Sequence, residues 1–286
     1  MKGLGIKKTQ KKDERFMKKI AFIGAGNMAR AMTIGLVNSG VAATNIMVAN
    51  PSSEKRVQLA HEFGVQQTSD NIEAANFADI IVLCVKPHFI CNVCQQLTRA
   101  IDISNKLFIS VAAGITIDQI QQALNSNAAV VRVMPNTPSQ LGLGMSGMFA
   151  SKEVNTEQKA ASDKLMSAVG KVIWLATEDK INHIIAVAGS APAYFFLFME
   201  AMEKQAQVLG FSAEESRMLV QQTALGAAQM VEHNTAPIST LRENVTSAGG
   251  TTFAALEQFK KEGLEQMVTN AMNAAITRAE EMAKGS

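Results

Sequence analysis

The sequence predicts a doubly wound α/β domain followed by an all-helical domain, and three observations lead to this prediction. Short β-prone runs alternate with helical segments from residue 18 to about residue 177, a pattern typical of a mainly parallel sheet with helices on both faces. From residue 178 onward the pattern is helical and no further strand is expected. The chain has 286 residues, 47% of them hydrophobic, which is enough for two domains with cores of their own.

The expected strands of the α/β domain are short and mostly apolar throughout. Continuous apolar runs are typical of strands that helices cover on both faces. Such strands are expected over residues 20–23, 45–49, 78–85, 106–111, 129–133, 145–150 and 172–175. Helical spacing is clear over residues 27–38, which Gly40 follows, and over residues 54–63, which Gly64 closes.

The second domain is expected to consist of long helices. Residues 181–209 are consistent with one helix that is interrupted or bent at Pro192, because proline lacks the backbone donor of a helix interior. Ser212 and Glu215 have the spacing of a capping box and predict a helix over residues 213–233. Further helices are expected after Gly250 and over residues 264–283.

We expect three segments: a lysine-rich, disordered extension (1–16), a nucleotide-binding domain (17–177) and a helical domain (178–286). Small residues and methionine between residues 224 and 230 would let helices approach closely, but too little chain remains to bury so much apolar helix. This favours interdigitated dimerisation. A monomeric bundle packed on the first domain is the alternative.

Composition and charge exclude several classes of protein. A high apolar content and a net charge of +2 exclude an intrinsically disordered chain and make a strongly basic nucleic-acid binder unlikely. Apolar stretches such as residues 78–85 and 191–199 are shorter than the roughly 20 residues that span a bilayer. Three cysteines cannot form a disulfide framework, which favours a reducing compartment. We therefore expect a cytoplasmic protein with neither nucleic acid nor membrane as a partner.

A glycine-rich turn directly follows the first expected strand and opens a helix. The first glycine permits a tight turn, the second lets the backbone contact a pyrophosphate, and a small third residue lets helix and strand pack closely. The helix start adds N–H donors for the phosphates. The turn reads Gly24, Ala25, Gly26, Asn27, Met28 and Ala29. This pattern predicts a Rossmann domain that binds NAD or NADP.

The end of the second strand bears on the choice between the two dinucleotides. NAD-preferring sites place an acidic residue there for the ribose 2′-hydroxyl. In this chain Asn50 is followed by proline and two serines, and no acid precedes Glu54. Lys55 and Arg56 lie close behind and would tolerate a 2′-phosphate, although a solvated helix face explains them equally well. NADPH is favoured, and NADH is possible.

Three later strand ends also have loop sequences at the edge of the sheet where ligands bind in open α/β folds. The first contains Val85, Lys86 and Pro87. The second contains Ala112, Ala113 and Gly114, whose small size would let a nicotinamide ring lie against backbone. In the third, Asn136 and Thr137 are candidates for bonding the carboxamide of that ring, although ordinary turn chemistry accounts for each of them separately.

The most unusual stretch of the helical domain is residues 241–256. A helical pattern stops, two glycines and four hydroxyl residues follow, and a helix resumes. Exposed amides at that helix start form an anion site that suits a small carboxylate, and Thr251 and Thr252 add hydroxyl donors. A simple helix–loop–helix with threonine as N-cap is the alternative.

This stretch closely resembles the signature of the pyrroline-5-carboxylate reductase family. Further motifs agree at residues 24–29, 85–87, 133–138 and 188–194, so the resemblance runs from about residue 18 to residue 280. The family usually has proline where Ala248 stands and glycine where Ala191 stands. The resemblance implies reduction of the C=N bond of 1-pyrroline-5-carboxylate by NAD(P)H, which gives L-proline in the last step of proline biosynthesis. It also implies a homodimer through intertwined helical domains, often in rings of dimers.

The resemblance also implies roles for individual residues. Asn50, Asn71, Lys86 and Asn244 would join the glycine turn in holding the cofactor. Glu178, Val245, Ser247, Gly250, Thr251 and Thr252 would line the substrate site. Thr252 would bond the ring nitrogen and pass it a proton from water. A cyclic imine is already electrophilic, so no metal is expected, and Cys91 and Cys94 lack the further ligands of a zinc site.

Two other functions are kept open. A related Rossmann-plus-helical dehydrogenase for hydroxy acids or imines would share the architecture, but hydroxy-acid enzymes of that kind usually carry a catalytic lysine on the long interdomain helix. Residues 183–202 contain no lysine, and Lys204 comes too late in the helix. The other possibility is a non-catalytic NAD(P)-binding protein.

Overall fold

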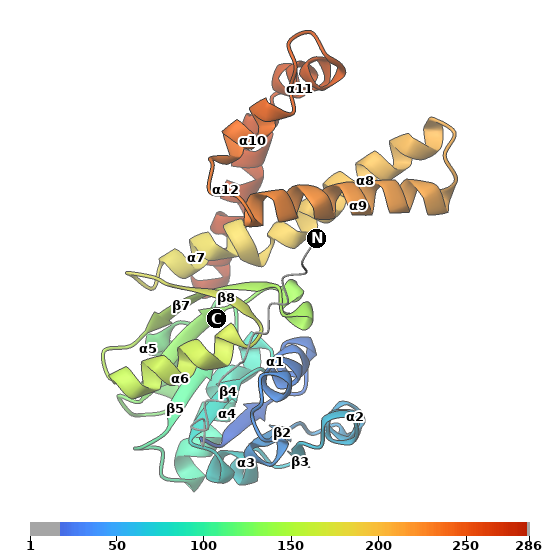
Figure 1. The fold of residues 1–286 in the computed structure, drawn as a ribbon. Helices are drawn as coiled ribbons and strands as arrows, with labels where there is room; N and C mark the ends of the chain where they lie inside the picture. The colour runs from blue at the N-terminus through green and yellow to red at the C-terminus, as the bar shows by residue number, and fades with distance from the viewer. Residues whose placement is uncertain (1–17, 285–286) are drawn as a thin grey trace, which may run out of the picture. The chain divides into compact units, whose positions relative to one another are not determined.

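The computed structural model describes residues 18–284. The expected basic extension over residues 1–16 therefore lies outside the described residues. Residues 18–174 build a sheet with helices on both faces, and helices alone follow. Figure 1 shows this succession along the colour gradient.

The sheet has eight strands in the order β3-β2-β1-β4-β5-β6-β7-β8. All neighbouring strands are parallel except β6 and β7, which are antiparallel. The strands are Ile20–Ile23 (β1), Ile46–Ala49 (β2), Gln66–Thr68 (β3), Ile80–Leu83 (β4), Leu107–Ser110 (β5), Ala129–Met134 (β6), Gly144–Ala150 (β7) and Gly170–Trp174 (β8). The strand order reverses at β1, so a crevice for ligands is expected outside the carboxyl ends of β1 and β4.

Helices cover the two faces of this sheet in two groups of three. One face packs against α1 (Asn27–Asn38), α2 (Ser53–Phe63) and α6 (Thr156–Ser167). The other face packs against α3 (Asn71–Phe77), α4 (Pro87–Ala100) and α5 (Ile117–Ala123). The short 3₁₀ helices η1 (Ala43–Asn45) and η2 (Thr137–Leu141) occupy connections.

The central strands are apolar throughout because both of their faces are buried. Phe22 on β1 and Ile109 on β5 contribute to the core on the α1 side. Ile23 and Phe108, their neighbours in the sequence, contribute to the core on the α4 side. The two cores together fix the register of the strands, because a slip of one residue would exchange every side chain between the faces. The predicted α/β Rossmann fold is therefore confirmed.

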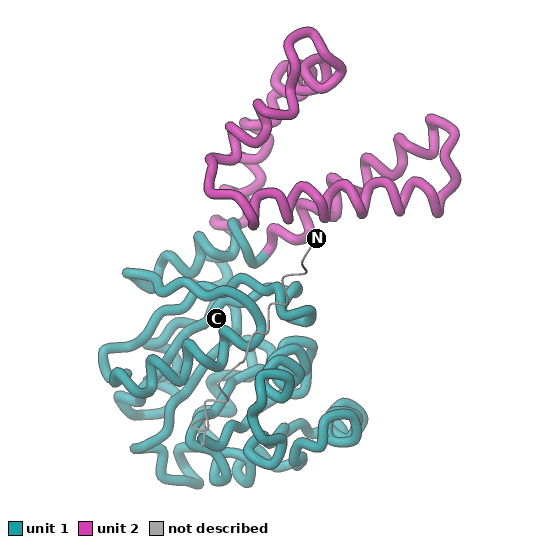
Figure 2. Tube along the Cα trace, viewed as in Figure 1, with its two compact units in different colours: residues 1–189, 278–286 teal, residues 190–277 magenta. Residues whose placement is uncertain are grey.

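Residues 190–277 form a second compact unit, and the described residues 18–189 with 278–284 form the first (Figure 2). The helices of the second unit are α8 (Ala191–Val208), α9 (Ala213–Glu232), α10 (Ile238–Asn244) and α11 (Thr251–Lys261), followed by most of α12 (Leu264–Lys284). No strand follows Trp174 within the described part of the chain. The prediction of an all-helical second part is confirmed, and the functional boundary at residue 178 stays a prediction.

Two local expectations need correction. The helix expected over residues 181–209 is divided into α7 (Lys180–Ile184), a π-helical turn η3 (Ile185–Gly189) and α8. Pro192 lies in the first turn of α8, where its missing N–H costs no hydrogen bond, so the interruption comes before the proline. Strand β3 was not expected, because Gln66 and Gln67 lack the apolar signal of the buried strands.

The expected capping box of α9 is present. The Ser212 hydroxyl accepts a hydrogen bond from the Glu215 amide at 3.2 Å, and the Glu215 carboxylate accepts one from the Ser212 amide at 2.8 Å. These hydrogen bonds with Ser212 lower the pKa of the Glu215 carboxyl below its usual range. The box therefore defines the start of α9 through two reciprocal bonds.

The helices of the second unit expose many large apolar side chains. Phe195, Phe196 and Leu197 are each more than 60% exposed on α8. The continuous helical stretch Lys180–Val208 is long and apolar enough to cross a membrane by length and composition alone, which is weak evidence for a membrane span. Contiguous exposed apolar surface of this kind marks an interaction site.

We predict that the core around β5 sets the stability of the first unit. Phe108→Ala removes a ring that is 0% exposed and should lower the free energy of unfolding by roughly 3–5 kcal/mol. Val57→Ala on α2 removes a side chain that is 47% exposed and should change it by less than about 0.5 kcal/mol. Chemical denaturation of both variants checks this, and equal losses would contradict the described core.

Candidate functional site

A cavity of about 520 Å³ lies at the carboxyl ends of β1, β2 and β4, in the crevice that the strand order predicts. The glycine turn, the end of β2 and the first two turns of α4 contribute to its walls. Its lining residues are Gly24, Ala25, Gly26, Asn50, Pro51, Ser52, Glu54, Lys55, Asn71, Cys84, Val85, Lys86, Phe89, Asn92, Val93 and Gln96. The volume falls within the usual range for small-molecule sites.

The glycine turn has the geometry that a dinucleotide requires. Gly24 has a φ of +108°, and a Cβ atom there would lie 2.8 Å from the Cys84 carbonyl oxygen. A Cβ atom at Gly26 would meet no atom within 4 Å, so the backbone there is open to a ligand. Gly26 is the N-cap of α1, and no side chain caps this helix. The first amides of α1 are therefore suited to bind a phosphate group.

Asn50 connects the glycine turn to the end of β2. Its Oδ1 accepts a hydrogen bond from the Ala25 amide at 3.4 Å, and its Nδ2 donates one to the Ser52 carbonyl at 3.1 Å. The amide side chain thereby holds two walls of the cavity together. Asn71, which opens α3, contributes to the same cavity.

The two cations after β2 have different surroundings. Lys55 lines the cavity together with Ser52. The guanidinium of Arg56 instead donates a hydrogen bond to the side chain of Gln67 on β3, and Arg56 is not among the lining residues. Only Lys55 of this pair is thus placed to meet a ligand in the cavity.

The other predicted cofactor residues do not line the cavity. Asn27 and Met28 begin α1, and Pro87 begins α4. Ala112, Ala113 and Gly114 follow the carboxyl end of β5, at the same edge of the sheet. Asn244 ends α10 in the second unit, and its role with the cofactor stays a prediction.

Asn136, a candidate for the nicotinamide carboxamide, is buried and engaged within the protein. Its Nδ2 donates to the Ala188 carbonyl at 3.1 Å, and its Oδ1 accepts from the Met145 amide at 2.9 Å. Both ends of the amide therefore hold loops together, which matches the interpretation as turn chemistry.

Glu178 lies in the first unit and has two partners there. One carboxylate oxygen, Oε1, accepts from Arg132 Nη1 at 3.0 Å and from the Ile117 amide at 2.8 Å. Arg132 lies outside the motif at residues 133–138, although a cation within the apolar run of β6 is itself a signal. The substrate role that the resemblance gives Glu178 stays a prediction.

The predicted substrate segment forms a loop between α10 and α11 in the second unit. Val245 is the C-cap of α10, and Gly249 has a φ of +69°. Gly250 is the N-cap of α11 and no side chain caps this helix, so threonine does not act as the N-cap. Thr251 and Thr252 are exposed in the first turn. The first amides of α11 are therefore suited to bind a carboxylate.

The remaining residues of this segment are consistent with an open loop. Ser247 is exposed, and its carbonyl accepts a hydrogen bond from the Gly250 amide at 3.0 Å. Ala248, where the resembled family has proline, is exposed as well. Ala191, where that family has glycine, is the buried first residue of α8.

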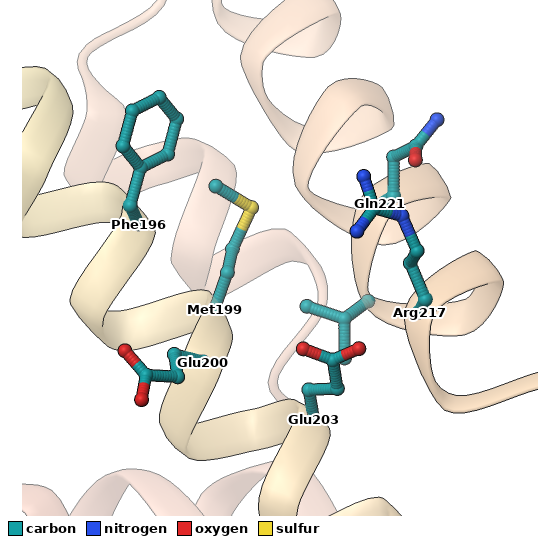
Figure 3. Close-up of a pocket in the computed structure, with 7 residues that line it drawn as sticks. Phe196, Met199, Glu200, Glu203, Arg217 and Gln221 are labelled. Carbon is teal, nitrogen blue, oxygen red and sulfur yellow. The ribbon is translucent and has the colours of Figure 1, made fainter. Parts of the chain in front are cut away.

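A second cavity, of about 290 Å³, lies between α8 and α9 in the second unit (Figure 3). Phe196 and Met199 of α8 line it with Arg217 and Gln221 of α9. None of the predicted site residues lines it. It belongs to the exposed apolar surface of the helical unit.

Cys84 and Cys94 have the surroundings of inert thiols. Cys94 is buried, and this burial raises the pKa of its thiol to about 12. Burial also raises the pKa of the Cys84 thiol far above its usual value. Residues 18–284 contain no group of three His, Cys, Asp or Glu side chains that could hold a metal ion. Cys94 is therefore a core residue of α4 rather than a reactive thiol.

We predict that the two glycines of the turn fail in different ways. Gly24→Ala places a methyl group against backbone at a φ that only glycine adopts readily, and should cost roughly 1–3 kcal/mol of stability. Gly26→Ala meets no protein atom and should leave stability unchanged while weakening dinucleotide binding. Thermal unfolding and NADPH titration of both variants check this, and unaltered NADPH binding by Gly26→Ala would contradict the assigned phosphate site.

Comparisons with known families agree with this geometry. Residues 178–282 match the domain described as pyrroline-5-carboxylate reductase dimerisation, and residues 19–114 match the domain described as NADP oxidoreductase, coenzyme F420-dependent. The two matches follow one another along the chain. Together they cover the glycine turn and the loop before α11.

Curated relatives match over nearly the whole chain. Pyrroline-5-carboxylate reductase of Vibrio alginolyticus is 56% identical over 268 residues, which cover 93% of this chain and 98% of the relative. The enzyme of the same name from Pasteurella multocida is 45% identical, and the match again covers 93% of this chain and 98% of the relative.

Solved structures lead to the same family. A pyrroline-5-carboxylate reductase from Coxiella burnetii has a TM-score of 0.89 and 41% identity, and the match covers 93% of this chain and 98% of that one. A pyrroline carboxylate reductase from Plasmodium falciparum, solved with NADP bound, has a TM-score of 0.83 and 30% identity. This match also covers 93% of this chain and 98% of that one. The chain therefore belongs to the pyrroline-5-carboxylate reductase family.

Proposed function

We propose that this chain reduces 1-pyrroline-5-carboxylate to L-proline with NAD(P)H as the hydride donor. The observation that carries this function is the 56% identity to a curated pyrroline-5-carboxylate reductase across both units of the chain. The prediction of an NAD(P)H-dependent reductase that acts on a C=N bond is confirmed by such relatives. A hydroxy-acid dehydrogenase is disfavoured, because α8 carries no lysine before Lys204.

The residues of the first unit fit a bound dinucleotide. The open space at Gly26 and the uncapped start of α1 fit a pyrophosphate. Ala112 to Gly114 follow β5 at the same edge of the sheet, and Ala113, the one of the three that is not buried, would let a nicotinamide ring approach the backbone there. When bound, the reduced nicotinamide supplies the hydride for the imine carbon. The protein's task is then to hold the imine carbon in reach, and positioning of this kind supplies roughly 7–11 kcal/mol.

The loop before α11 is proposed to hold the substrate. The amides at the start of α11 would donate hydrogen bonds to the substrate carboxylate. The residues around that carboxylate would be Val245, Ser247, Gly250 and Thr251. The Thr252 hydroxyl would donate a hydrogen bond to the ring nitrogen, which gains a proton, from water, as the imine carbon gains the hydride. No metal is needed for this chemistry, because a cyclic imine is already electrophilic.

The assembly is proposed from the exposed apolar helices of the second unit. The match of residues 178–282 to a dimerisation domain supports a homo-oligomer, and we propose a homodimer through these helices, in rings of dimers. A second copy would cover side chains such as Phe195 and Phe196, which accounts for the apolar stretch Lys180–Val208 without a membrane. The related enzymes favour a cytoplasmic location.

We predict that Thr252 acts in the chemical step. Thr252→Ala should lower kcat/KM by roughly 10- to 150-fold, the value of one hydrogen bond to a charged group, and should retain NADPH binding. Thr252→Ser keeps the hydroxyl and should retain most of the activity. The assay is NADPH oxidation with pyrroline-5-carboxylate, run beside a panel of keto acids. Turnover by Thr252→Ala at the wild-type rate would eliminate this role.

NADPH preference is proposed to depend on Lys55 and not on Arg56. Lys55→Ala should raise the KM for NADPH roughly 10-fold and leave the KM for NADH unchanged, because only NADPH carries the 2′-phosphate. Arg56→Ala, whose partner is Gln67, should change either KM by less than about twofold. Steady-state kinetics with both nucleotides check this. A larger effect at Arg56 than at Lys55 would reverse the assignment.

A further inference from the structure

Arg132 is a cation inside the core of the sheet. It lies on β6, where it is opposite Ser110 of β5 and Phe149 of β7, and the whole residue is 2% exposed. Val130, two residues earlier on the same face of β6, belongs to the core on the α5 side. A guanidinium in such surroundings is tolerated only with a carboxylate beside it.

Glu178 supplies that carboxylate and uses the same oxygen for a second task. Oε1 lies 3.0 Å from Arg132 Nη1 and 2.8 Å from the amide nitrogen of Ile117. Ile117 is the first residue of α5, which Thr116 and Gln119 cap. One carboxylate oxygen thus joins strand β6 to the start of α5.

The segment held in this way is the loop between β5 and α5, residues 111–116. At its start, the Ala112 amide donates to the Ser110 hydroxyl at 3.4 Å. In its middle, a Cβ atom added at Gly114 would lie 3.3 Å from Cβ of Met282, near the end of α12. At its end stands Ile117, bonded to Glu178. The loop also has hydrogen bonds from the Val111 amide to the Leu83 carbonyl at 3.3 Å and from the Thr116 amide to the Gln119 side chain at 2.8 Å. The Glu178 contact differs from these because its acceptor is charged.

Arg132 depends on Glu178 because its other guanidinium nitrogens have no partner of their own. Nε and Nη2 of Arg132 are buried and have no hydrogen-bond partner. Glu178 is also the one acid that forms an ion pair with Arg132 among the described residues. Loss of its charge would leave a buried guanidinium uncompensated, next to an amide without its acceptor.

We propose that the buried Arg132 and the partly exposed Glu178 form a positioning pair that holds the β5–α5 loop in place for the nicotinamide half of the cofactor. The inference rests on the proposed function, in which Ala112 to Gly114 face the nicotinamide ring. Glu178 then acts through the loop and does not touch the substrate. A substrate ligand and a positioning residue predict different measurements.

The test compares binding of NADPH with binding of 2′,5′-ADP, which keeps the 2′-phosphate and lacks the nicotinamide. Glu178→Gln should weaken NADPH roughly 10-fold, the effect of a lost charge-assisted contact, and leave 2′,5′-ADP within about twofold. Glu178→Asp is the second variant, to be used if the Gln variant does not fold. It keeps the charge but shortens the side chain, and it should likewise weaken NADPH binding while leaving 2′,5′-ADP binding nearly unchanged. Glu157→Gln, at an exposed ion pair with Lys18, is the control and should change neither ligand.

Kinetics add a second readout. At saturating pyrroline-5-carboxylate, Glu178→Gln should lower kcat roughly 10-fold, with the KM for the imine within about threefold of the wild type. A raised KM for the imine with unchanged kcat would overturn the proposal and make Glu178 a substrate ligand. Equal weakening of both nucleotides, or of neither, would also overturn it. If the wild type oxidised no NADPH with this imine, the proposed function would fail, while the ratio of the two binding constants would still decide the role of Glu178.

Discussion

Two helices at the proposed sites, α1 and α11, have a glycine as N-cap and no side-chain cap, and the proposed chemistry depends on that shared feature. Gly26 precedes α1 and Gly250 precedes α11. In most helices a serine, threonine, aspartate or asparagine would accept hydrogen bonds from the first amides. Here those donors are open to an external anion, a pyrophosphate at α1 and a carboxylate at α11. In the proposed reaction, the same backbone feature would bind both the cofactor and the substrate.

The rest of the first unit keeps the glycine turn in place. Strands buried on both faces bring the ends of β1 and β4 together, so that Gly24 lies against the Cys84 carbonyl. No side chain fits between them, and Asn50 ties the turn to β2. The second unit is organised differently. Its long helices leave apolar side chains such as Phe195 and Leu197 exposed, and the proposed homodimer would cover them.

The sequence predicted most of the fold because the signals were local. Apolar runs marked the buried strands to within a few residues, and Ser212 with Glu215 marked the start of α9. Strand β3 was missed, since a polar strand at the edge of a sheet lacks that signal. The division of the helix before Pro192 was placed a few residues too late, because a proline in the first turn of a helix and one at a kink look alike in sequence.

The site was predictable where a motif is contiguous and not where it depends on contacts between distant residues. The glycine turn and the loop before α11 are each encoded within a few residues. The different surroundings of Lys55 and Arg56 follow from the position of β3, which sequence spacing did not reveal. Arg132 and Glu178 are 46 positions apart in the sequence, and no local pattern at either residue predicts that they form a pair.

The most direct test of the central claim is a crystal structure of the protein with NADP⁺ and a non-reacting proline analogue. The nicotinamide ring should lie against Ala112 to Gly114, with the pyrophosphate at the start of α1. The carboxylate of the analogue should accept hydrogen bonds from the amides at the start of α11, with Thr252 beside the ring nitrogen. A carboxylate bound elsewhere, with those amides facing only solvent in every copy of the chain, would contradict the account.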